Sequence, residues 1–223
     1  MSNVSVWQDR LRGSLRLYVL TDRQLARGRS EPEVVEAAIA GGATAIQLRW
    51  KTGSMREALT VGRELKQICA RSGVLFVVND RIDLALALDS DGVHLGDEDL
   101  PLLAARRIIG NQMLIGYSPP TLAEAIEAEQ LGADYLGIGP VYGTSTKADA
   151  GDAVGVERIA AVSRAVSIPI VGIGGINAAN AARVVAAGAA GVAVISSVVA
   201  ADDIRAATLR LRNALVSAGS QPV

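Results

Sequence analysis

Eight short apolar segments recur along the chain, and each ends in polar or glycine-rich residues that could take part in chemistry. They span residues 17–22, 45–51, 74–80, 92–96, 113–118, 135–141, 170–175 and 191–197. Continuous apolar runs bounded by turn signals are typical of strands buried on both faces, as in an all-parallel sheet. Polar residues at the carboxyl ends of such strands are what a (β/α)8 barrel enzyme needs, because its pocket opens there. The pattern therefore predicts an α/β fold, a single (β/α)8 TIM barrel.

Segments with helical spacing and recognisable ends separate these runs. Ser30 is a predicted N-cap with Pro32 in the first turn after it, and Gly41 closes the same helix. The predicted helices cover residues 31–40, 55–71, 100–109, 121–130, 156–165, 177–187 and 202–216. Because strands and helices alternate without a linker or a shift in composition, the pattern supports one wound domain. An open, doubly wound sheet is the alternative architecture.

The length of 223 residues fits one such barrel and leaves little room for an added domain. We expect a single catalytic domain over residues 1–223, with flexible tails at residues 1–14 and 217–223. The sequence leaves the oligomeric state open, with a homodimer among the options.

Charge and apolar composition exclude several classes of partner. The formal net charge is −1, and no Lys or Arg run is dense enough to attract nucleic acid or a membrane surface. No uninterrupted apolar stretch is long enough to span a bilayer, and residues 1–12 lack the apolar region of a signal peptide. The one cysteine, Cys69, falls in a helical pattern and suits a reducing compartment. We expect a cytoplasmic protein with small-molecule partners.

Glycines and a serine follow the seventh and eighth apolar runs. In barrels of this kind the loops after these two strands often bind phosphate, because small residues let backbone N–H groups approach an anion. Gly174, Gly175 and Ser196 suit that purpose. The alternative is that the glycines only permit tight packing where strand meets helix.

The second run ends in Gln47, Arg49 and Lys51, which alternate with apolar residues. A strand has a side-chain period of two, so these three side chains share one face. Two cations and an amide on one face suit a charged, oxygen-rich group. Alternatively, Arg49 and Lys51 belong to a solvated loop and pair with acidic residues.

Carboxylates follow the third and fourth runs. Asp80 with Asp99 would make a hard-oxygen site for Mg²⁺, which is often held by one or two carboxylates and substrate phosphates. Asp97 and Glu98 are competing candidates, and one of these acids could simply cap the following helix. His94, the only histidine, lies inside an apolar run and is interpreted as a satisfied core or supporting residue rather than a catalyst.

A loop with hydroxyl groups and a lysine follows the sixth run. Its polar residues are Thr144, Ser145, Thr146 and Lys147. The order differs from that of a Walker motif, but hydroxyls followed by a lysine in a glycine-bounded loop suit a phosphate. The alternative is a flexible surface loop.

Taken together, these segments resemble the thiamine-phosphate synthase (thiamine-phosphate pyrophosphorylase) family through nearly the whole length from Tyr18 to Ser196. The matching blocks include Tyr18-Val-Leu-Thr-Asp22, Gln47-Leu-Arg-x-Lys51, Val78-Asn-Asp-Arg81, Asp91-Gly-Val-His-Leu-Gly96, Asp99, Ile115-Gly-x-Ser118, Gly139-Pro-Val-Tyr142, Thr144-x-Thr-Lys147 and Gly172-Ile-Gly-Gly-Ile176. No single block is specific, but the combination is.

The resemblance implies a transferase that joins a hydroxymethylpyrimidine diphosphate to a thiazole phosphate, forming thiamine phosphate and releasing pyrophosphate. Carried over by position, the pyrimidine diphosphate would be bound by Gln47, Arg49, Lys51, Asn79, Ser118 and Lys147. The thiazole phosphate would be bound by Thr144, Ser145, Thr146, Gly175, Ile195 and Ser196. The metal ligands would be Asp80 and Asp99, with one Mg²⁺ per subunit. The catalytic residues would be Arg49, Lys51, Ser118 and Lys147.

The chemistry implied by the resemblance begins with departure of the diphosphate. The resulting methylene cation would be stabilised by the amino group of the pyrimidine, and the thiazole nitrogen would then attack it. Mg²⁺ with Arg49, Lys51 and Lys147 could offset the growing negative charge on the diphosphate. Such a reaction needs no enzyme nucleophile, which fits a chain with one cysteine and one histidine.

The chain departs from the common family pattern at several positions. Two prolines follow Ser118, where a histidine is common two residues on. Trp50 is bulkier than usual, Asp97 stands where glutamine is common, and Gly143 where proline is common. The missing histidine puts an acid–base role near Ser118 in doubt, but ionisation does not depend on it.

Two other functions fit the same barrel. A thiazole tautomerase would keep the thiazole-phosphate site without needing Lys51, Asp80, Asp99 and Lys147 together. A non-catalytic sensor of phosphorylated ligands could keep the glycines and lose the metal carboxylates. The chain has all four of these charged residues, which favours the synthase.

Overall fold

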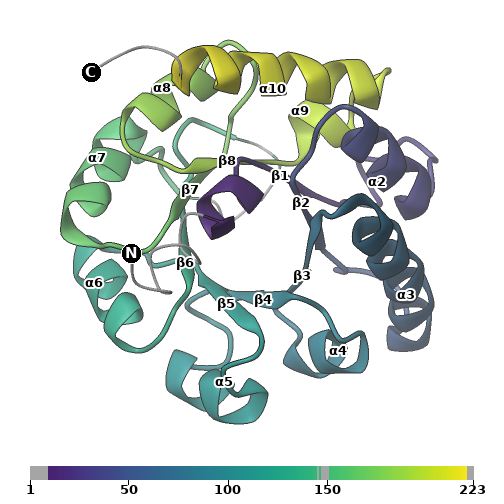
Figure 1. Ribbon diagram of the computed structural model, residues 1–223, viewed down its shortest axis with the longest axis horizontal. Coiled ribbons are helices and arrows are strands. Elements are labelled where there is room, and N and C mark those ends of the chain that lie inside the picture. The colour runs from purple at the N-terminus through teal and green to yellow at the C-terminus, as the bar shows by residue number, and fades with distance from the viewer. Residues whose placement is uncertain (1–9, 145, 147–150, 220–223) are drawn as a thin grey trace.

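The computed structural model of the protein describes residues 10–144, 146 and 151–219 (Figure 1). Its parallel strands close into one barrel in the order of the sequence, with β8 beside β1. The strands are β1 (Leu17–Leu20), β2 (Ala45–Leu48), β3 (Leu75–Asn79), β4 (Gly92–Leu95), β5 (Leu114–Tyr117), β6 (Tyr135–Ile138), β7 (Ile170–Ile173) and β8 (Gly191–Val194). This confirms the predicted (β/α)8 barrel over the open sheet.

Helices surround the barrel on its outer side (Figure 1). They are α2 (Glu31–Ala40), α3 (Met55–Ser72), α4 (Ile82–Ala87), α5 (Leu102–Ile109), α6 (Leu122–Gln130), α7 (Gly155–Ala165), α8 (Ala181–Ala186), α9 (Ser196–Val199) and α10 (Ile204–Gly219). The side chain of Ser30 caps α2 in a capping box with Glu33, and Ser54 and Thr121 cap α3 and α6. These caps explain why the predicted starts of the three helices agree with the structure.

The helical predictions differ from the structure at α8 (Ala181–Ala186), and they omit α4 and α9. The helix expected at 177–187 begins only at Ala181, because Asn177 and Asn180 form a side-chain turn before it: Asn180 Oδ1 accepts from the Asn177 N–H at 2.9 Å. The short helices α4 and α9 were not predicted at all.

The apolar residues form an outer and an inner cluster. The outer cluster lies between strands and helices and includes Cys69, whose thiol pKa is raised by burial to about 12. The inner cluster fills the barrel and includes the fully buried rings of Tyr18 and Tyr135. This arrangement agrees with Cys69 as a core residue.

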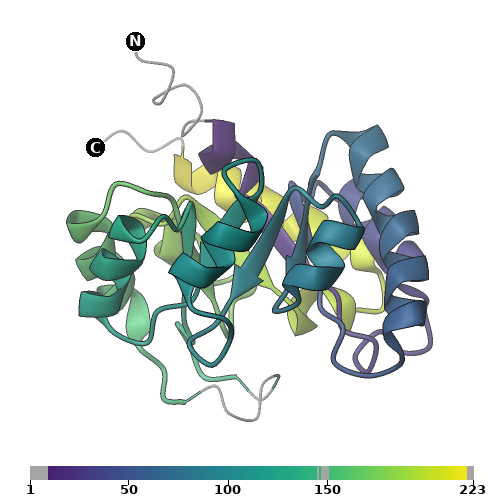
Figure 2. The same cartoon turned by 90° about the horizontal axis from the view of Figure 1, so that it is seen from below.

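The first described residues close the amino end of the barrel. Residues 10–14 are helical, and Leu11 and Leu15 are buried in the inner cluster. Figure 2 shows this helix on the side of the barrel opposite the loop that follows β6. Residues 10–14 therefore form a helix rather than part of the expected tail, and residues 217–219 belong to α10. The remaining tail residues, 1–9 and 220–223, lie outside the described residues.

Within the described part of the chain, we find no helix with both the length and the apolar character needed to cross a membrane.

Candidate active site

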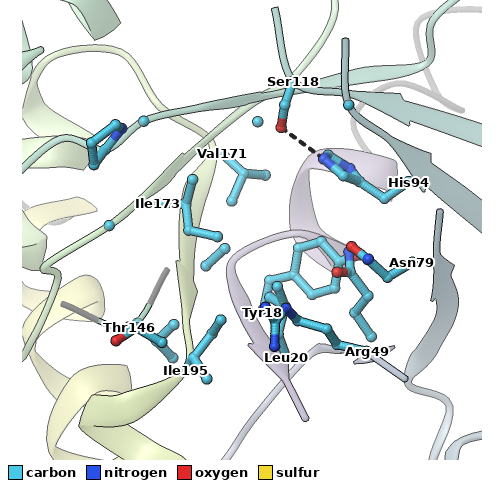
Figure 3. Close-up of a pocket in the computed structure, with 18 of the residues that line it drawn as sticks. Tyr18, Leu20, Arg49, Asn79, His94, Ser118, Thr146, Val171, Ile173 and Ile195 are labelled. Carbon is cyan, nitrogen blue, oxygen red and sulfur yellow. Dashed lines mark hydrogen bonds between the residues drawn. The ribbon is translucent and has the colours of Figure 1, made fainter. Parts of the chain in front are cut away.

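A cavity of about 470 Å³ opens at the carboxyl ends of the strands (Figure 3). The predicted site residues that line it are Gln47, Arg49, Lys51, Asn79, Asp80, Asp99, Ser118, Thr144, Thr146, Gly175, Ile195 and Ser196. Ser145 and Lys147 lie outside the described residues. Twelve predicted residues from the ends of separate strands and the segments after them thus meet at one cavity, as expected when parallel strands end at the same side of a barrel.

The cations that follow β2 face carboxylates of neighbouring strands. Arg49 Nη1 lies 2.6 Å from Asp22 Oδ2, after β1, and Lys51 Nζ lies 2.6 Å from Asp80 Oδ2, after β3. Both cations therefore pair with acids, as the alternative interpretation expected, and both also line the cavity, where Arg49 is mostly buried and Lys51 is about half exposed.

Trp50, between the two cations, turns away from the cavity. Its ring packs against the outer apolar cluster, and the guanidinium of Arg23 lies 4.2 Å above it in a cation–π contact. Arg23 is held there by Glu31 and Glu57, each at 2.8 Å. The unusual tryptophan is thus accommodated on the outer side of the barrel.

Asp80 lies close enough to Asp99 to affect the pKa of the Asp99 carboxyl. Burial raises the pKa of the Asp99 carboxyl, and the negative charge of Asp80 raises it further. Asp99 Oδ2 is oriented by the backbone N–H of Gly96 at 2.7 Å. Asp97 and Glu98 also line the cavity.

Among residues 10–144, 146 and 151–219, no group of three or more His, Cys, Asp or Glu is arranged to hold a metal ion. A pair of carboxylates is nevertheless what Mg²⁺ uses when substrate phosphates complete its ligands.

Small and hydroxylated residues form the opposite wall. Thr146 Oγ1 donates to Ser196 Oγ at 3.1 Å, which joins the loop after β6 to the start of α9. Gly175 has a φ of +64°, and its carbonyl accepts from Asn180 Nδ2 at 3.0 Å. Figure 3 shows Thr146 and Ile195 on one side of the cavity, with Asn79 and His94 on the other.

His94, interpreted from the sequence as a satisfied core or supporting residue, has a partner at each ring nitrogen. Its Nδ1 lies 3.0 Å from the hydroxyl of Tyr135 and its Nε2 lies 2.9 Å from Ser118 Oγ. Burial lowers the pKa of the imidazole to about 4, so the ring is neutral near pH 7. His94 is thus satisfied by neighbours and supports Ser118 (Figure 3).

Tyr18 and Tyr135 form the floor of the cavity and were not predicted to belong to it. Gln47 Nε2 donates to the hydroxyl of Tyr18 at 2.7 Å, and the two tyrosine hydroxyls lie 3.1 Å apart. Gln47 Oε1 is buried and has no hydrogen-bond partner among the described residues. A buried acceptor beside a cavity suits a donor group on a ligand.

Comparisons with known proteins point to one family. Residues 17–198 match the family described as thiamine monophosphate synthase. A thiamine-phosphate synthase from Chloroflexus aurantiacus is 55% identical over 202 residues, which cover 91% of this chain and 93% of that protein. One from Moorella thermoacetica is 50% identical, covering 91% and 96%. The solved thiamine phosphate pyrophosphorylase from Pyrococcus furiosus is 46% identical with a TM-score of 0.87, covering 93% of this chain and 98% of that one.

Proposed function

The chain belongs to the thiamine monophosphate synthase family and has thiamine-phosphate synthase activity, and we propose that the cavity described above is its active site. The protein is accordingly a transferase of thiamine biosynthesis. In the proposed reaction, the hydroxymethylpyrimidine diphosphate and the thiazole phosphate bind together in the cavity. One observation carries this proposal. The charged pair Lys51 and Asp80 and the hydroxyl pair Thr146 and Ser196 line opposite walls of the same cavity. The charged pair is expected to hold the pyrimidine diphosphate, and the hydroxyl pair the thiazole phosphate.

The residues present fit one Mg²⁺ per subunit, bound by Asp80 and Asp99. Burial raises the pKa of Asp99, and the negative charge of Asp80 raises it further, so the two carboxylates repel each other in a partly buried place. A divalent cation would relieve that repulsion, and substrate phosphates would supply further oxygen ligands. When bound, Mg²⁺ would stabilise negative charge on the diphosphate.

Arg49, Lys51 and Lys147 would contact the diphosphate. The bond between the methylene carbon and the diphosphate oxygen breaks, and its electron pair leaves with the oxygen. Preorganised cations lower the energy of that charge separation without having to reorganise. Arg49 is well placed for this role, because Asp22 fixes its guanidinium at 2.6 Å.

Gln47, Asn79 and Ser118 would hold the pyrimidine ring, and the free Oε1 of Gln47 suits the exocyclic amino group. The lone pair of that amino group stabilises the methylene cation, and the thiazole nitrogen then forms the new carbon–nitrogen bond. The cavity keeps the two reactants adjacent and limits the access of water to the cation.

Thr144, Ser145, Thr146, Gly175, Ile195 and Ser196 would bind the thiazole phosphate. We further propose that the whole chain is one catalytic domain and that it acts in the cytoplasm, which suits the buried free thiol of Cys69. The proposed partners are the two small-molecule substrates.

The function is tested by incubating purified protein with both substrates and Mg²⁺ and measuring pyrophosphate and thiamine phosphate. Equal amounts of the two products are expected, and omission of either substrate should stop the formation of thiamine phosphate. Addition of EDTA should stop pyrophosphate release, and excess Mg²⁺ should restore it. Failure to form thiamine phosphate from the complete mixture would refute the assignment.

Thr146→Val should chiefly weaken binding of the thiazole phosphate. The change keeps the shape of the side chain but removes the hydroxyl that reaches Ser196 at 3.1 Å. Loss of one hydrogen bond to a charged group corresponds to a rise of about tenfold in KM for the thiazole phosphate. Steady-state kinetics with each substrate varied in turn measure the effect.

Thr60→Val is the matched control for this prediction, because Thr60 lies on the exposed side of α3 and bonds only to the Arg56 carbonyl. An unchanged KM for the thiazole phosphate in Thr146→Val, or an equal rise in both substrates' KM values, would argue against the role assigned to Thr146.

A further inference from the structure

A continuous chain of hydrogen bonds crosses the floor of the cavity. It runs from Gln47 Nε2 to the Tyr18 hydroxyl at 2.7 Å, to the Tyr135 hydroxyl at 3.1 Å, to His94 Nδ1 at 3.0 Å, and from His94 Nε2 to Ser118 Oγ at 2.9 Å. We call these five residues the floor relay. Its two ends, Gln47 and Ser118, both line the cavity.

The strands leave room for the floor relay at two glycines. His94 in β4, Gly116 in β5 and Tyr135 in β6 are neighbours in the barrel register. A Cβ at Gly116 would collide with the Tyr135 hydroxyl and with His94 Nδ1, and one at Gly137 would lie 2.9 Å from Ser118 Oγ. The sequence thus omits side chains where the hydrogen bonds pass.

The hydrogen-bond directions in the floor relay can be assigned from its first donor, Gln47. The amide nitrogen of Gln47 can only donate, so Tyr18 accepts from it and directs its own proton to Tyr135. Tyr135 then donates to His94 Nδ1. A neutral imidazole carries one N–H group, so the proton is on Nε2 and is donated to Ser118. Ser118 accepts this bond and keeps its own proton for a group in the cavity.

The opposite polarity would require the Gln47 amide to be reversed. In the structure Gln47 Nε2 faces the Tyr18 hydroxyl, and the oxygen of the same amide is buried without a partner. Buried carbonyl oxygens with a free lone pair are more common in proteins than buried N–H groups without acceptors. The assigned polarity therefore follows from the orientation of this amide.

We propose that Tyr135 is a positioning residue that fixes His94 as the Nε2–H tautomer. The Ser118 hydroxyl, which accepts from this N–H group, then donates a hydrogen bond to a ring nitrogen of the pyrimidine. The inference rests on the proposed location of the pyrimidine beside Ser118. It makes the two ends of the floor relay complementary, with an acceptor at Gln47 and a donor at Ser118. A ring that carries an amino group and an unprotonated nitrogen matches both ends.

The tautomer can be measured directly, because His94 is the only histidine in the chain. A long-range ¹H–¹⁵N correlation spectrum of tag-free, ¹⁵N-labelled protein near pH 7 should show a protonated Nε2 and an unprotonated Nδ1. A protonated Nδ1 would overturn the proposal. In Tyr135→Phe, the bond to Nδ1 is absent, and the signals should move towards a mixture of tautomers; unchanged signals would also overturn it.

Kinetics test whether Tyr135 acts through Ser118. Tyr135→Phe should lower kcat/KM for the pyrimidine diphosphate by about tenfold, the size of one hydrogen bond, without changing KM for the thiazole phosphate. In a Ser118→Ala background the same change should have no further effect, because coupled residues are not additive. The matched control is Tyr117→Phe, since Tyr117 packs against the outer cluster next to Ser118 and should tolerate the change.

The outcomes separate this inference from the proposed function. If Ser118→Ala is impaired but the effect of Tyr135→Phe simply adds to it, the inference fails and the role of Ser118 stands. If Ser118→Ala retains normal kinetics, the role of Ser118 fails and the inference falls with it. The tautomer spectrum of the unmodified protein remains decisive even if a variant does not fold.

Discussion

Asp80→Asn is expected to lower kcat by about 10²- to 10³-fold, because several kcal/mol of charge stabilisation by a metal would be lost. Asp80 has a φ of +61°, a left-handed conformation that asparagine also adopts readily. The substitution therefore removes a charge without adding backbone strain. Asp80→Ala should be at least as inactive and also somewhat less stable, because alanine is disfavoured at this φ.

The dependence of the rate on Mg²⁺ identifies the cause of this loss. Asp80 also pairs with Lys51 at 2.6 Å, so its removal could act through the lysine. If Asp80 binds the metal, Asp80→Asn should need a much higher Mg²⁺ concentration for half-maximal rate. Normal turnover, or a reduced rate with an unchanged Mg²⁺ requirement, would reject the metal role. Asp83→Asn is the matched control, because Asp83 is largely exposed and pairs with Arg81 outside the cavity.

The barrel could be predicted because its strands are buried on both faces and its helices carry local signals. The run from Leu17 is apolar without interruption, and Ser30 and Ser54 mark the starts of the next two helices. Such signals lie within a few residues of the element they specify. They do not depend on distant contacts, so sequence reasoning can detect them.

The helices that sequence reasoning missed lack these signals. α4 follows Arg81, which makes no capping bond, and it spans only six residues from Ile82 to Ala87. α9 is four residues long and begins at Ser196. Short helices of this kind are stabilised by the surrounding packing rather than by their own sequence, since isolated short helices are marginal.

The charged part of the site was predictable, and its floor was not. Arg49 and Asp80 follow directly after apolar runs, so their types and positions together indicate chemistry. Tyr18 and Tyr135 lie inside such runs and are indistinguishable from ordinary core residues. Their hydroxyls meet only because β1 and β6 face each other across the closed barrel, a relation between residues 117 positions apart. Local sequence patterns do not indicate contacts between residues so far apart in the chain.

Gly175→Ala is expected to lower kcat/KM for the thiazole phosphate by about 100-fold, the order of loss that follows a displacement of ~1 Å in a binding group. A Cβ at Gly175 would lie 2.6 Å from the Gly143 carbonyl oxygen and 2.8 Å from Tyr142 Cβ, so the loop that carries Thr146 must move away. Gly151→Ala is the matched control, because Gly151 has a similar φ of +71° and no atom of the described residues lies within 4 Å of the added Cβ. The Gly151→Ala variant shares the backbone strain of roughly 1–2 kcal/mol without the collision.

Thermal melting separates strain from displacement. Both variants should lose stability, and only Gly175→Ala should lose thiazole-phosphate affinity. Equal kinetic losses in the two variants would assign the effect to strain and remove Gly175 from the phosphate site.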